Sequence, residues 1–311
     1  MTTPFRIGTR GSPLALWQAN WVKGQLEGAW QGLQVELIPI KTSGDKILNV
    51  PLSEVGGKGL FTKEIDEALL DGRVDCAVHS MKDIPFRLPQ GIDFGAIPER
   101  EDARDALISN GRRIDALPPA ARIGTSSLRR QVQLRHRFPS MRIVDLRGNV
   151  DTRLRKLADG EFDAIVLALA GLRRLGRESV VTQILEEEFM LPAVGQGALA
   201  ITCRSDDAGT RECLSVLDHH PTRVAVTAER GLLSALEGSC KVPIAGHAQL
   251  NSGRIVLKGL VANLAGTVVV TGEATGDPPK AHQLGVALGE DLIRRGAGAI
   301  LAEIGQHGSS R

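Results

Sequence analysis

The chain has 311 residues, of which 42% are hydrophobic and 24% are charged. This composition excludes a disordered chain, a fibrous repeat and a membrane-embedded protein, and the length predicts two or three folded domains. The 38 basic and 36 acidic residues nearly cancel, so the chain as a whole is not a polycation built to bind nucleic acid.

The first third of the chain alternates strands and helices. A strand at 5–8 leads to Ser12-Pro13, which supplies an N-cap and a first-turn proline for a helix to about Leu26. Hydrophobic periodicity predicts a further helix at 60–70 and further strands at 35–40, 74–78 and 92–97. This alternation is typical of a parallel or mixed sheet.

A second α/β region begins after the polar stretch 98–102, which we interpret as a hinge. Its expected strands lie at 106–108, 122–124, 142–145 and 164–167, and its expected helices at 128–137 and 150–157. A strand at 198–203 and a helix to about Leu217 follow.

The C-terminal part of the pattern differs, because a run of strands lies between helices. We expect a helix at 222–236, strands around Ala248 and at 255–261 and 267–271, and helices near 284–293 and 300–304. This order predicts a small α+β domain.

The four cysteines show no C-x-x-C spacing, and a chain of this length needs no disulfides for stability, so we expect reduced thiols in a cytoplasmic protein. The N-terminus leads directly into a strand without an apolar secretory core, and the longest apolar run, 164–172, is about half a membrane span. The absence of Cys/His clusters, P-loops and G-x-S-x-G motifs argues against metal, nucleotide and serine-hydrolase chemistry.

Arginine is concentrated in the middle of the chain. The 38 cations comprise 28 Arg and 10 Lys, and eleven of the Arg fall between Arg122 and Arg174, against five acids. Because a guanidinium group binds a carboxylate through two parallel hydrogen bonds, this composition predicts an anionic ligand for this region.

Polar residues also follow the expected strands, at the points where α/β sheets place their ligands. Such groups lie at 10–12, 80–83, 125–130 and 147–149. A helix cap with solvated charges explains each group taken alone. The four together favour a binding site for anions, since backbone N–H groups at helix starts attract negative charge.

Two residues carry open alternatives. Asp83 beside Lys82 is either half of a surface ion pair or an acceptor for the N–H group of a cationic intermediate. Cys240 is either a small buried hydrophobe or a reactive thiol, because it lies in a loop beside Lys241, whose charge favours the thiolate.

Five sequence blocks occur in a specific order along the chain. They are VGGKGLF at 55–61, VHSMKD at 78–83, GTSSLRRQ at 124–131, LRGNV at 146–150 and LPAVGQG at 191–197. In order and spacing they resemble the porphobilinogen deaminases, also called hydroxymethylbilane synthases. The resemblance runs from about Arg6 to Pro243 and more loosely to the end.

The resemblance implies an α/β fold of two periplasmic-binding-protein-like α/β domains, with the active-site cleft between them, plus a small C-terminal α+β domain. The first domain would be discontinuous and comprise 1–98 and 198–216. The Arg-rich second domain would comprise 103–192, and the third, which carries Cys240, would comprise 220–311.

The resemblance also implies a cytoplasmic, monomeric transferase of tetrapyrrole and haem biosynthesis. It would join four porphobilinogen molecules head to tail, with loss of ammonia, to give hydroxymethylbilane. The product would grow on a covalent dipyrromethane cofactor, bound through a thioether to Cys240. Asp83 would be the catalytic carboxylate, which stabilises the cation left when ammonia departs.

The implied site is rich in groups that bind carboxylates, because each pyrrole carries an acetate and a propionate. The implied cofactor-binding residues are Ser80, Lys82, Asp83, Thr125, Ser127, Arg129, Arg130, Arg147, Gly148 and Cys240. The implied substrate-binding residues are Arg10, Ser12, Lys58, Phe61, Arg147, Arg153, Arg174 and Gln196.

Two departures from the family pattern receive no role: Glu54 stands where some relatives have lysine, and Ser239 replaces a glycine that often precedes the anchor cysteine. Two rival hypotheses stay open, a non-catalytic binding protein for a small dicarboxylate and a nucleic-acid-binding module. The missing export signal and the Cys240 loop count against the first. The even charge and the aromatic content of 3% count against the second.

Overall fold

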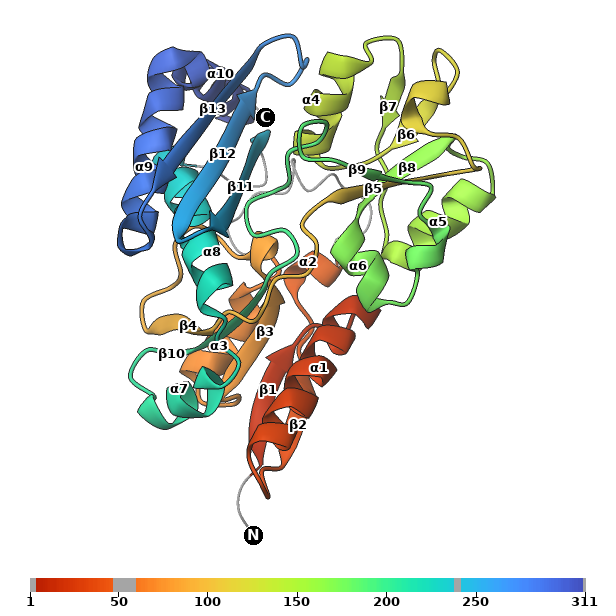
Figure 1. Ribbon diagram of the computed structural model, residues 1–311. Coiled ribbons are helices and arrows are strands. Elements are labelled where there is room, and N and C mark those ends of the chain that lie inside the picture. Colours follow the sequence, from red (N-terminus) through yellow and green to blue (C-terminus); the bar gives the residue numbers. More distant parts are fainter. Residues whose placement is uncertain (1–3, 47–59, 238–241, 310–311) are drawn as a thin grey trace. The chain divides into compact units, whose positions relative to one another are not determined.

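The computed structural model describes residues 4–46, 60–237 and 242–309. The chain divides into two compact units (Figure 1). The first holds the described parts of Met1–Asn49 and Gly57–Glu101 together with Gly197–Arg223, and the second holds Asp102–Gln196 and the described part of Val224–Arg311.

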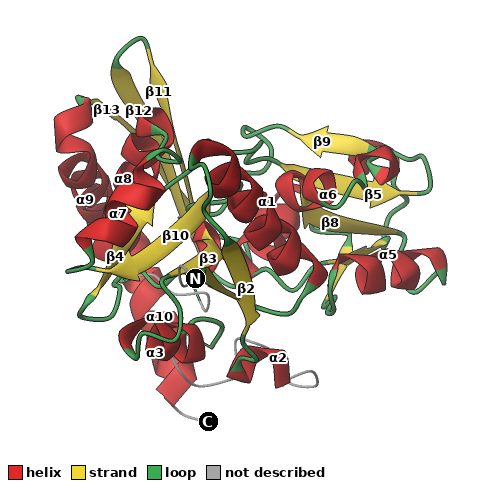
Figure 2. Cartoon of the chain, turned by 90° about the horizontal axis from the view of Figure 1, so that it is seen from below, coloured by secondary structure: helices red, strands yellow, loops and turns green. Residues whose placement is uncertain are grey.

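The sheet of the first unit is mixed. Its strands, in spatial order, are β2 (Val35–Pro39), β1 (Phe5–Thr9), β3 (Cys76–Ser80), β10 (Leu199–Arg204) and β4 (Ile92–Ala96). Strand β1 runs parallel to β2 and β3, whereas β10 runs antiparallel to β3 and β4. Figure 2 shows β10 beside β3 and β4. The carboxyl ends of β1 and β3 therefore lie at the same edge of the sheet.

Helices pack against both faces of this sheet. They are α1 (Pro13–Ala29), α3 (Lys63–Leu70) and α7 (Ala208–Ser215), whereas α2 (Ser43–Lys46) is a single turn after β2. Because side chains alternate along β3, Val78 packs in the core that contains Leu26 of α1, and Ala77 packs with Leu69 of α3. Ser12 caps α1 by accepting a hydrogen bond from the Ala15 N–H at 3.3 Å.

The second unit contains a similar mixed sheet. Its strands, in spatial order, are β7 (Arg142–Val144), β6 (Arg122–Gly124), β8 (Ala164–Ala168), β5 (Asp105–Ser109) and β9 (Gln183–Leu185). Its helices are α4 (Leu128–Arg137), α5 (Val150–Ala158) and α6 (Leu169–Arg174). Leu107 and Leu134 share one core cluster, and Ile108 and Leu157 share another.

A three-stranded antiparallel sheet completes the second unit. Its strands are β11 (Ile244–Asn251), β12 (Arg254–Ala262) and β13 (Val269–Gly276), and its helices are α8 (His220–Ala235, from Val224 onward in this unit), α9 (Ala281–Leu292) and α10 (Gly298–Ser309). A Cβ atom at Gly285 would lie 2.0 Å from the Ala228 carbonyl oxygen, so only glycine lets α9 pack this closely on α8.

The predicted α/β class with a small C-terminal α+β part is confirmed, and most predicted elements are present. The sequence analysis missed the short elements α2, α6 and β9. The apolar run 164–172 is half strand and half helix, because both halves are buried and hydrophobicity alone does not distinguish them. No helix within the described residues is both long enough and apolar enough to cross a membrane.

Candidate active site

Five of the predicted site residues line one small cavity in the first unit. They are Arg10, Ser12, Phe61, Ser80 and Asp83, and the cavity measures ≈ 60 Å³. Parallel β1 and β3 end at the same edge, which brings the segment after Thr9 to the segment after Val78. Ligand pockets usually measure roughly 300–1,000 Å³, so this cavity alone is smaller than a typical ligand pocket.

Asp83 ends a single turn of 3₁₀ helix, Met81–Asp83, directly after β3. The turn is held at both ends, since the Met81 N–H donates to the Ala198 carbonyl at 3.0 Å and the Ile84 N–H donates to the Met81 carbonyl at 3.1 Å. The Met81 side chain is buried, whereas the Asp83 side chain is exposed and Lys82 is half-buried. A fixed backbone therefore presents a solvent-accessible carboxylate beside the cavity.

Two side chains contact the Arg10 guanidinium, and the sequence patterns did not predict that they lie together. Its Nε donates to Asp45 Oδ1 at 3.2 Å, and its guanidinium lies 4.2 Å from the centre of the Phe61 ring. Burial alone would raise the pKa of Asp45, but hydrogen bonds from Arg10 and Thr42 outweigh it, so the pKa lies below its usual value. The carboxylate of Asp45 is thus paired with Arg10, a predicted substrate-binding residue.

Two buried polar residues complete the edge of the first unit. Gln18 of α1 donates from Nε2 to Ser80 Oγ at 2.9 Å, which orients the serine hydroxyl. His79 is also buried, and its Nε2 has no hydrogen-bond partner among the described residues. Burial, and then the charge of Arg10, lower the pKa of His79 to about 4, so its ring is neutral at physiological pH.

The predicted groups of the second unit gather around the start of α4. Thr125 is fully buried, and its Oγ1 accepts a hydrogen bond from the Ser127 N–H at 3.3 Å. Arg129 and Arg130 occupy the first turn of α4 and are each only 5% exposed. They share one buried carboxylate, Asp105, at 2.7 Å for each pair.

Further guanidinium groups lie near this pair. Arg153 donates from Nε to the Gly148 carbonyl oxygen at 2.8 Å. Gly148 has φ 114°, and a Cβ atom there would lie 2.6 Å from the Thr152 side chain, so the turn requires glycine. Burial, and then the charges of Arg130 and Arg147, lower the pKa of Arg153 to about 10. These cations repel one another, as expected for a site that binds anions.

The remaining predicted residues divide into two sets. Gln196 is buried, and its Nε2 donates to Asp105 Oδ1 at 2.9 Å, so it belongs to the arginine cluster. Arg174 is a buried residue of α6. Lys58 and Cys240 lie outside the described residues, and so do Glu54 and Ser239.

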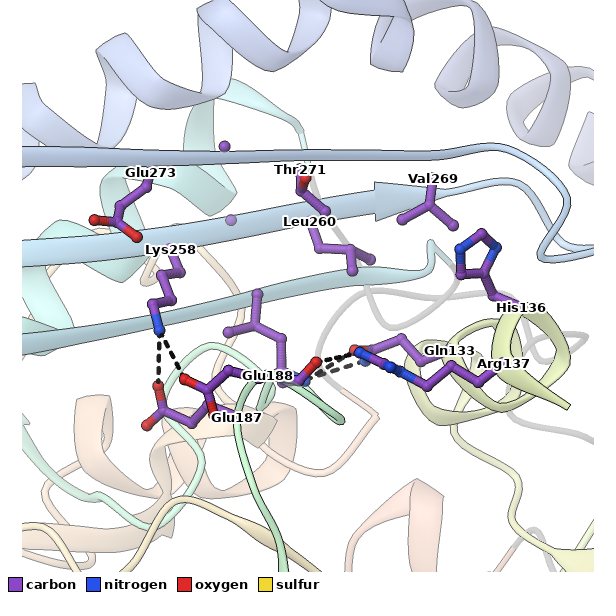
Figure 3. Close-up of a pocket in the computed structure, with 13 residues that line it drawn as sticks. Gln133, His136, Arg137, Glu187, Glu188, Lys258, Leu260, Val269, Thr271 and Glu273 are labelled. Atoms are coloured by element: carbon purple, nitrogen blue, oxygen red, sulfur yellow. Dashed lines mark hydrogen bonds and ion pairs between the residues drawn. The ribbon is translucent and has the colours of Figure 1, made fainter. Parts of the chain in front are cut away.

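A larger cavity of ≈ 430 Å³ lies elsewhere in the second unit and is lined by none of the predicted site residues. Figure 3 shows Lys258 of β12 pointing toward Glu187 and Glu188, and Leu260 and Val269 extending from the strands. The Lys258 ammonium lies 3.3 Å from Glu188. Among the described residues no group of three or more His, Cys, Asp or Glu side chains is arranged to hold a metal ion.

Comparison with known proteins identifies the family. The profile described as "Porphobilinogen deaminase, dipyromethane cofactor binding domain" matches residues 5–212, and the profile of the family's C-terminal domain matches residues 224–294. The chain belongs to the porphobilinogen deaminase family. A porphobilinogen deaminase of Geobacter sulfurreducens is 53% identical over 307 residues, which is 99% of this chain and 96% of that protein.

Solved structures of ligand-binding proteins match more weakly. An ancestral cationic amino acid solute-binding protein has a TM-score of 0.42 and 15% identity, covering 68% of this chain and 89% of that chain. The periplasmic VFT2 domain of BvgS from Bordetella pertussis has a TM-score of 0.40 and 15% identity, covering 68% of this chain and 84% of that chain. At these TM-scores the two matches carry no argument about the fold.

Family membership confirms the predicted cofactor class, since the profile over residues 5–212 is that of a dipyrromethane-binding domain. The residues of the second unit fit such a group. Arg129 and Arg130 pair with the buried carboxylate of Asp105, and the charges of Arg130 and Arg147 act on Arg153. The acetate and propionate groups of a dipyrromethane would supply negative charge to match these cations.

Sequence reasoning missed Asp105, Asp45 and Gln18 as parts of these clusters. Asp105 left a signal, because it is a charged residue that opens the apolar run of β5. Asp45 and Gln18 left none, since each is an ordinary polar residue until the sheet brings it to Arg10 or Ser80.

Proposed function

We propose that this chain joins four porphobilinogen molecules head to tail, with release of ammonia, to give hydroxymethylbilane. The observation that carries the proposal is the meeting of Arg10, Ser80 and Asp83 at one cavity, in a chain 53% identical to a porphobilinogen deaminase over 99% of its length. A carboxylate, a cation and a hydroxyl at one edge are the groups that a cationic pyrrole with acidic side chains requires.

The dipyrromethane group, bound as a thioether to Cys240, supplies the pyrrole carbon onto which substrate units are added. We assign Arg129, Arg130, Arg147 and Arg153 to hold its carboxylates, because they form a partly buried cluster with excess positive charge. Thr125 and Ser127 directly precede α4, Gly148 precedes α5, and these residues offer hydroxyl and backbone groups.

Asp83 is the proposed catalytic residue. Loss of ammonia from the aminomethyl group of the substrate leaves positive charge that is shared with the pyrrole N–H. A carboxylate that accepts this N–H stabilises the cation as it forms. The 3₁₀ turn keeps the Asp83 backbone in place, so little reorganisation is needed during the reaction.

Arg10 is the proposed grip for a substrate carboxylate. In the structure the guanidinium of Arg10 forms an ion pair with Asp45. The side chain of Arg10 is 24% exposed and that of Asp45 is 29% exposed. A partly solvated ion pair of this kind contributes little stability, so a substrate carboxylate can replace Asp45. Phe61 covers one face of the guanidinium, and Ser12 and Ser80 add hydroxyl groups to the same cavity.

The finer proposals concern organisation and location. We propose a monomer with domains at 1–98 with 198–216, at 103–192 and at 220–311, which acts in the cytoplasm and binds no nucleic acid. The separate three-stranded sheet of β11–β13 supports a third domain. The unpaired thiols of Cys76, Cys203 and Cys213 support a reducing compartment.

Intact-protein mass spectrometry of freshly purified protein tests the proposal, with Cys240→Ser as the control. We expect the sequence mass plus two linked pyrrole units in the wild type and the sequence mass alone in the variant. Incubation with porphobilinogen should then release ammonia and a linear tetrapyrrole. A wild-type protein that neither carries the added mass nor gains it from porphobilinogen contradicts the proposal and favours a dicarboxylate-binding protein.

A further inference from the structure

Asp105, the first residue of β5, is a fully buried carboxylate at the centre of the arginine cluster. Its Oδ1 accepts hydrogen bonds from Arg130 Nη2 at 2.7 Å, Arg130 Nε at 3.0 Å and Gln196 Nε2 at 2.9 Å. Its Oδ2 accepts from Arg129 Nη1 at 2.7 Å. One carboxylate thus contacts three of the predicted binding residues.

The charges in this cluster do not balance. Burial by itself raises the pKa of Asp105, but the charges and hydrogen bonds of Arg129 and Arg130 outweigh burial, and the pKa lies below its usual value. Asp105 is therefore ionised at physiological pH. Two buried cations against one anion leave one positive charge to be balanced, and Arg129 Nε is buried without a hydrogen-bond partner among the described residues.

Asp105 also restricts how the two guanidinium groups lie. Arg129 Nη1 is shared between Asp105 and the Leu191 carbonyl oxygen, the latter at 2.8 Å. Arg130 uses Nε and Nη2 for Asp105 and Nη1 for the Val166 carbonyl oxygen at 3.0 Å. Because a guanidinium is planar, hydrogen bonds at two of its nitrogens determine its plane and the direction of the remaining N–H groups.

We propose that Asp105 is a positioning residue for carboxylate binding: it orients Arg129, Arg130 and Gln196 and leaves a net single positive charge for the ligand. Without Asp105 the two guanidinium groups would repel each other and lose their shared acceptor. This inference rests on the proposed function, because it requires these arginines to bind carboxylates.

The test compares Asp105→Asn with the wild type and with Asp75→Asn. Asp75 is a matched control, since its Oδ1 accepts from Arg6 Nη2 at 2.7 Å and its Oδ2 from Arg6 Nε at 3.2 Å, in the first unit. Three quantities are measured: the melting temperature, kcat and KM for porphobilinogen, and the fraction of chains that carry dipyrromethane by intact mass.

Both variants should melt at a lower temperature than the wild type. Asp105→Asn alone should raise KM about tenfold and lower the dipyrromethane-carrying fraction, because the arginines lose the charged acceptor that orients them. A KM and a carrying fraction within about twofold of the wild type in Asp105→Asn overturn the inference.

A second variant covers the case in which Asp105→Asn does not fold. Asp105→Asn combined with Arg129→Met removes one charge of each sign, so the net charge is kept and the repulsion between the two buried guanidinium groups is removed. Its KM should stay below the product of the two separate effects, because part of the effect of Asp105 on binding passes through Arg129. A KM that multiplies the separate effects overturns the inference.

Failure of the proposed function gives a different result. If the wild type and Asp75→Asn both release no ammonia, the proposed function fails. Stabilisation of the same proteins by added porphobilinogen, measured as a shift in melting temperature, then decides the inference. A wild-type shift that is lost in Asp105→Asn and kept in Asp75→Asn supports it, and equal shifts in all three overturn it.

Discussion

The arginines of the two units differ in how far they are exposed to solvent and in how they are paired. Arg10 of the first unit is 24% exposed, pairs with a partly solvated Asp45 and lies beside a small open cavity. Arg129 and Arg130 of the second unit are each 5% exposed and share a carboxylate that is 0% exposed. The solvated pair can exchange partners at a low cost in free energy, whereas breaking the buried pair would leave an uncompensated buried charge.

This contrast separates two tasks of one enzyme. The edge of the first unit carries Asp83 on a short turn beside the small cavity, where we propose that it contacts the substrate. The cluster of the second unit holds cations at fixed positions, which suits binding of a carboxylate-rich group throughout several additions. Changes at the edge should therefore lower kcat, and changes in the cluster should raise KM.

The largest effect is expected at Asp83. Asp83→Asn keeps the size of the side chain but removes its charge, so the cation formed on loss of ammonia lacks its counter-charge, and kcat should fall about 10²–10³-fold. KM should change by less than about threefold, and the melting temperature should stay unchanged, because the side chain is exposed. Steady-state release of ammonia measures both constants. A normal kcat would remove Asp83 from the chemistry.

Arg153 should show the opposite behaviour. Its folded-state pKa of about 10 means that the folded protein disfavours its charge, so Arg153→Met should leave the melting temperature unchanged or raise it. KM for porphobilinogen should rise about tenfold, because a carboxylate of the bound pyrrole loses the guanidinium of Arg153 as a hydrogen-bond donor. Calorimetric melting and initial rates on the same preparation check the two parts. A lower melting temperature with normal KM would make Arg153 a structural residue.

His79 predicts a pH effect on stability in the first unit. Its pKa falls from 6.5 to about 4 on folding, so the stability that depends on its neutral form is present above pH 6.5 and is lost as the pH falls toward about 4. Over that range the loss is roughly 1–3 kcal/mol. Denaturant unfolding at several pH values should show a weaker acid destabilisation in His79→Gln. Parallel pH profiles for the two proteins would contradict this assignment.

Asp66 on α3 predicts a smaller effect of the opposite sign. Burial, with a contribution from Glu67, raises its pKa from 3.8 to about 6, so its contribution to stability is present below pH 3.8 and is lost as the pH rises through about 6. Asp66→Asn should therefore raise the free energy of unfolding at neutral pH by about 1 kcal/mol and leave it unchanged near pH 4. A gain that is equal at both pH values would argue against a buried, ionised Asp66.

Local sequence patterns predicted most of the helices and strands that position the site. Ser12-Pro13 predicted the start of α1, and the apolar runs at 74–78 and 164–167 predicted β3 and β8, because caps and hydrophobic periodicity depend on neighbours in the chain. Short elements such as β9 were missed, since three residues carry too little periodicity.

The sequence by itself determined the family, because the order and spacing of its motifs can be compared without coordinates. The roles of Asp83 and Cys240 and the carboxylate-binding arginines stay predictions from it. Only the tertiary structure decided which of those arginines are buried and what holds them. Asp105 meets Arg129 and Arg130 across 24 and 25 positions, and Asp45 meets Arg10 across 35, through the packing of strands and helices rather than through any local spacing. Pairing of charges over such separations depends on the fold. It leaves Arg10 in a partly solvated ion pair that can change partners, whereas Arg129 and Arg130 are held by a buried carboxylate.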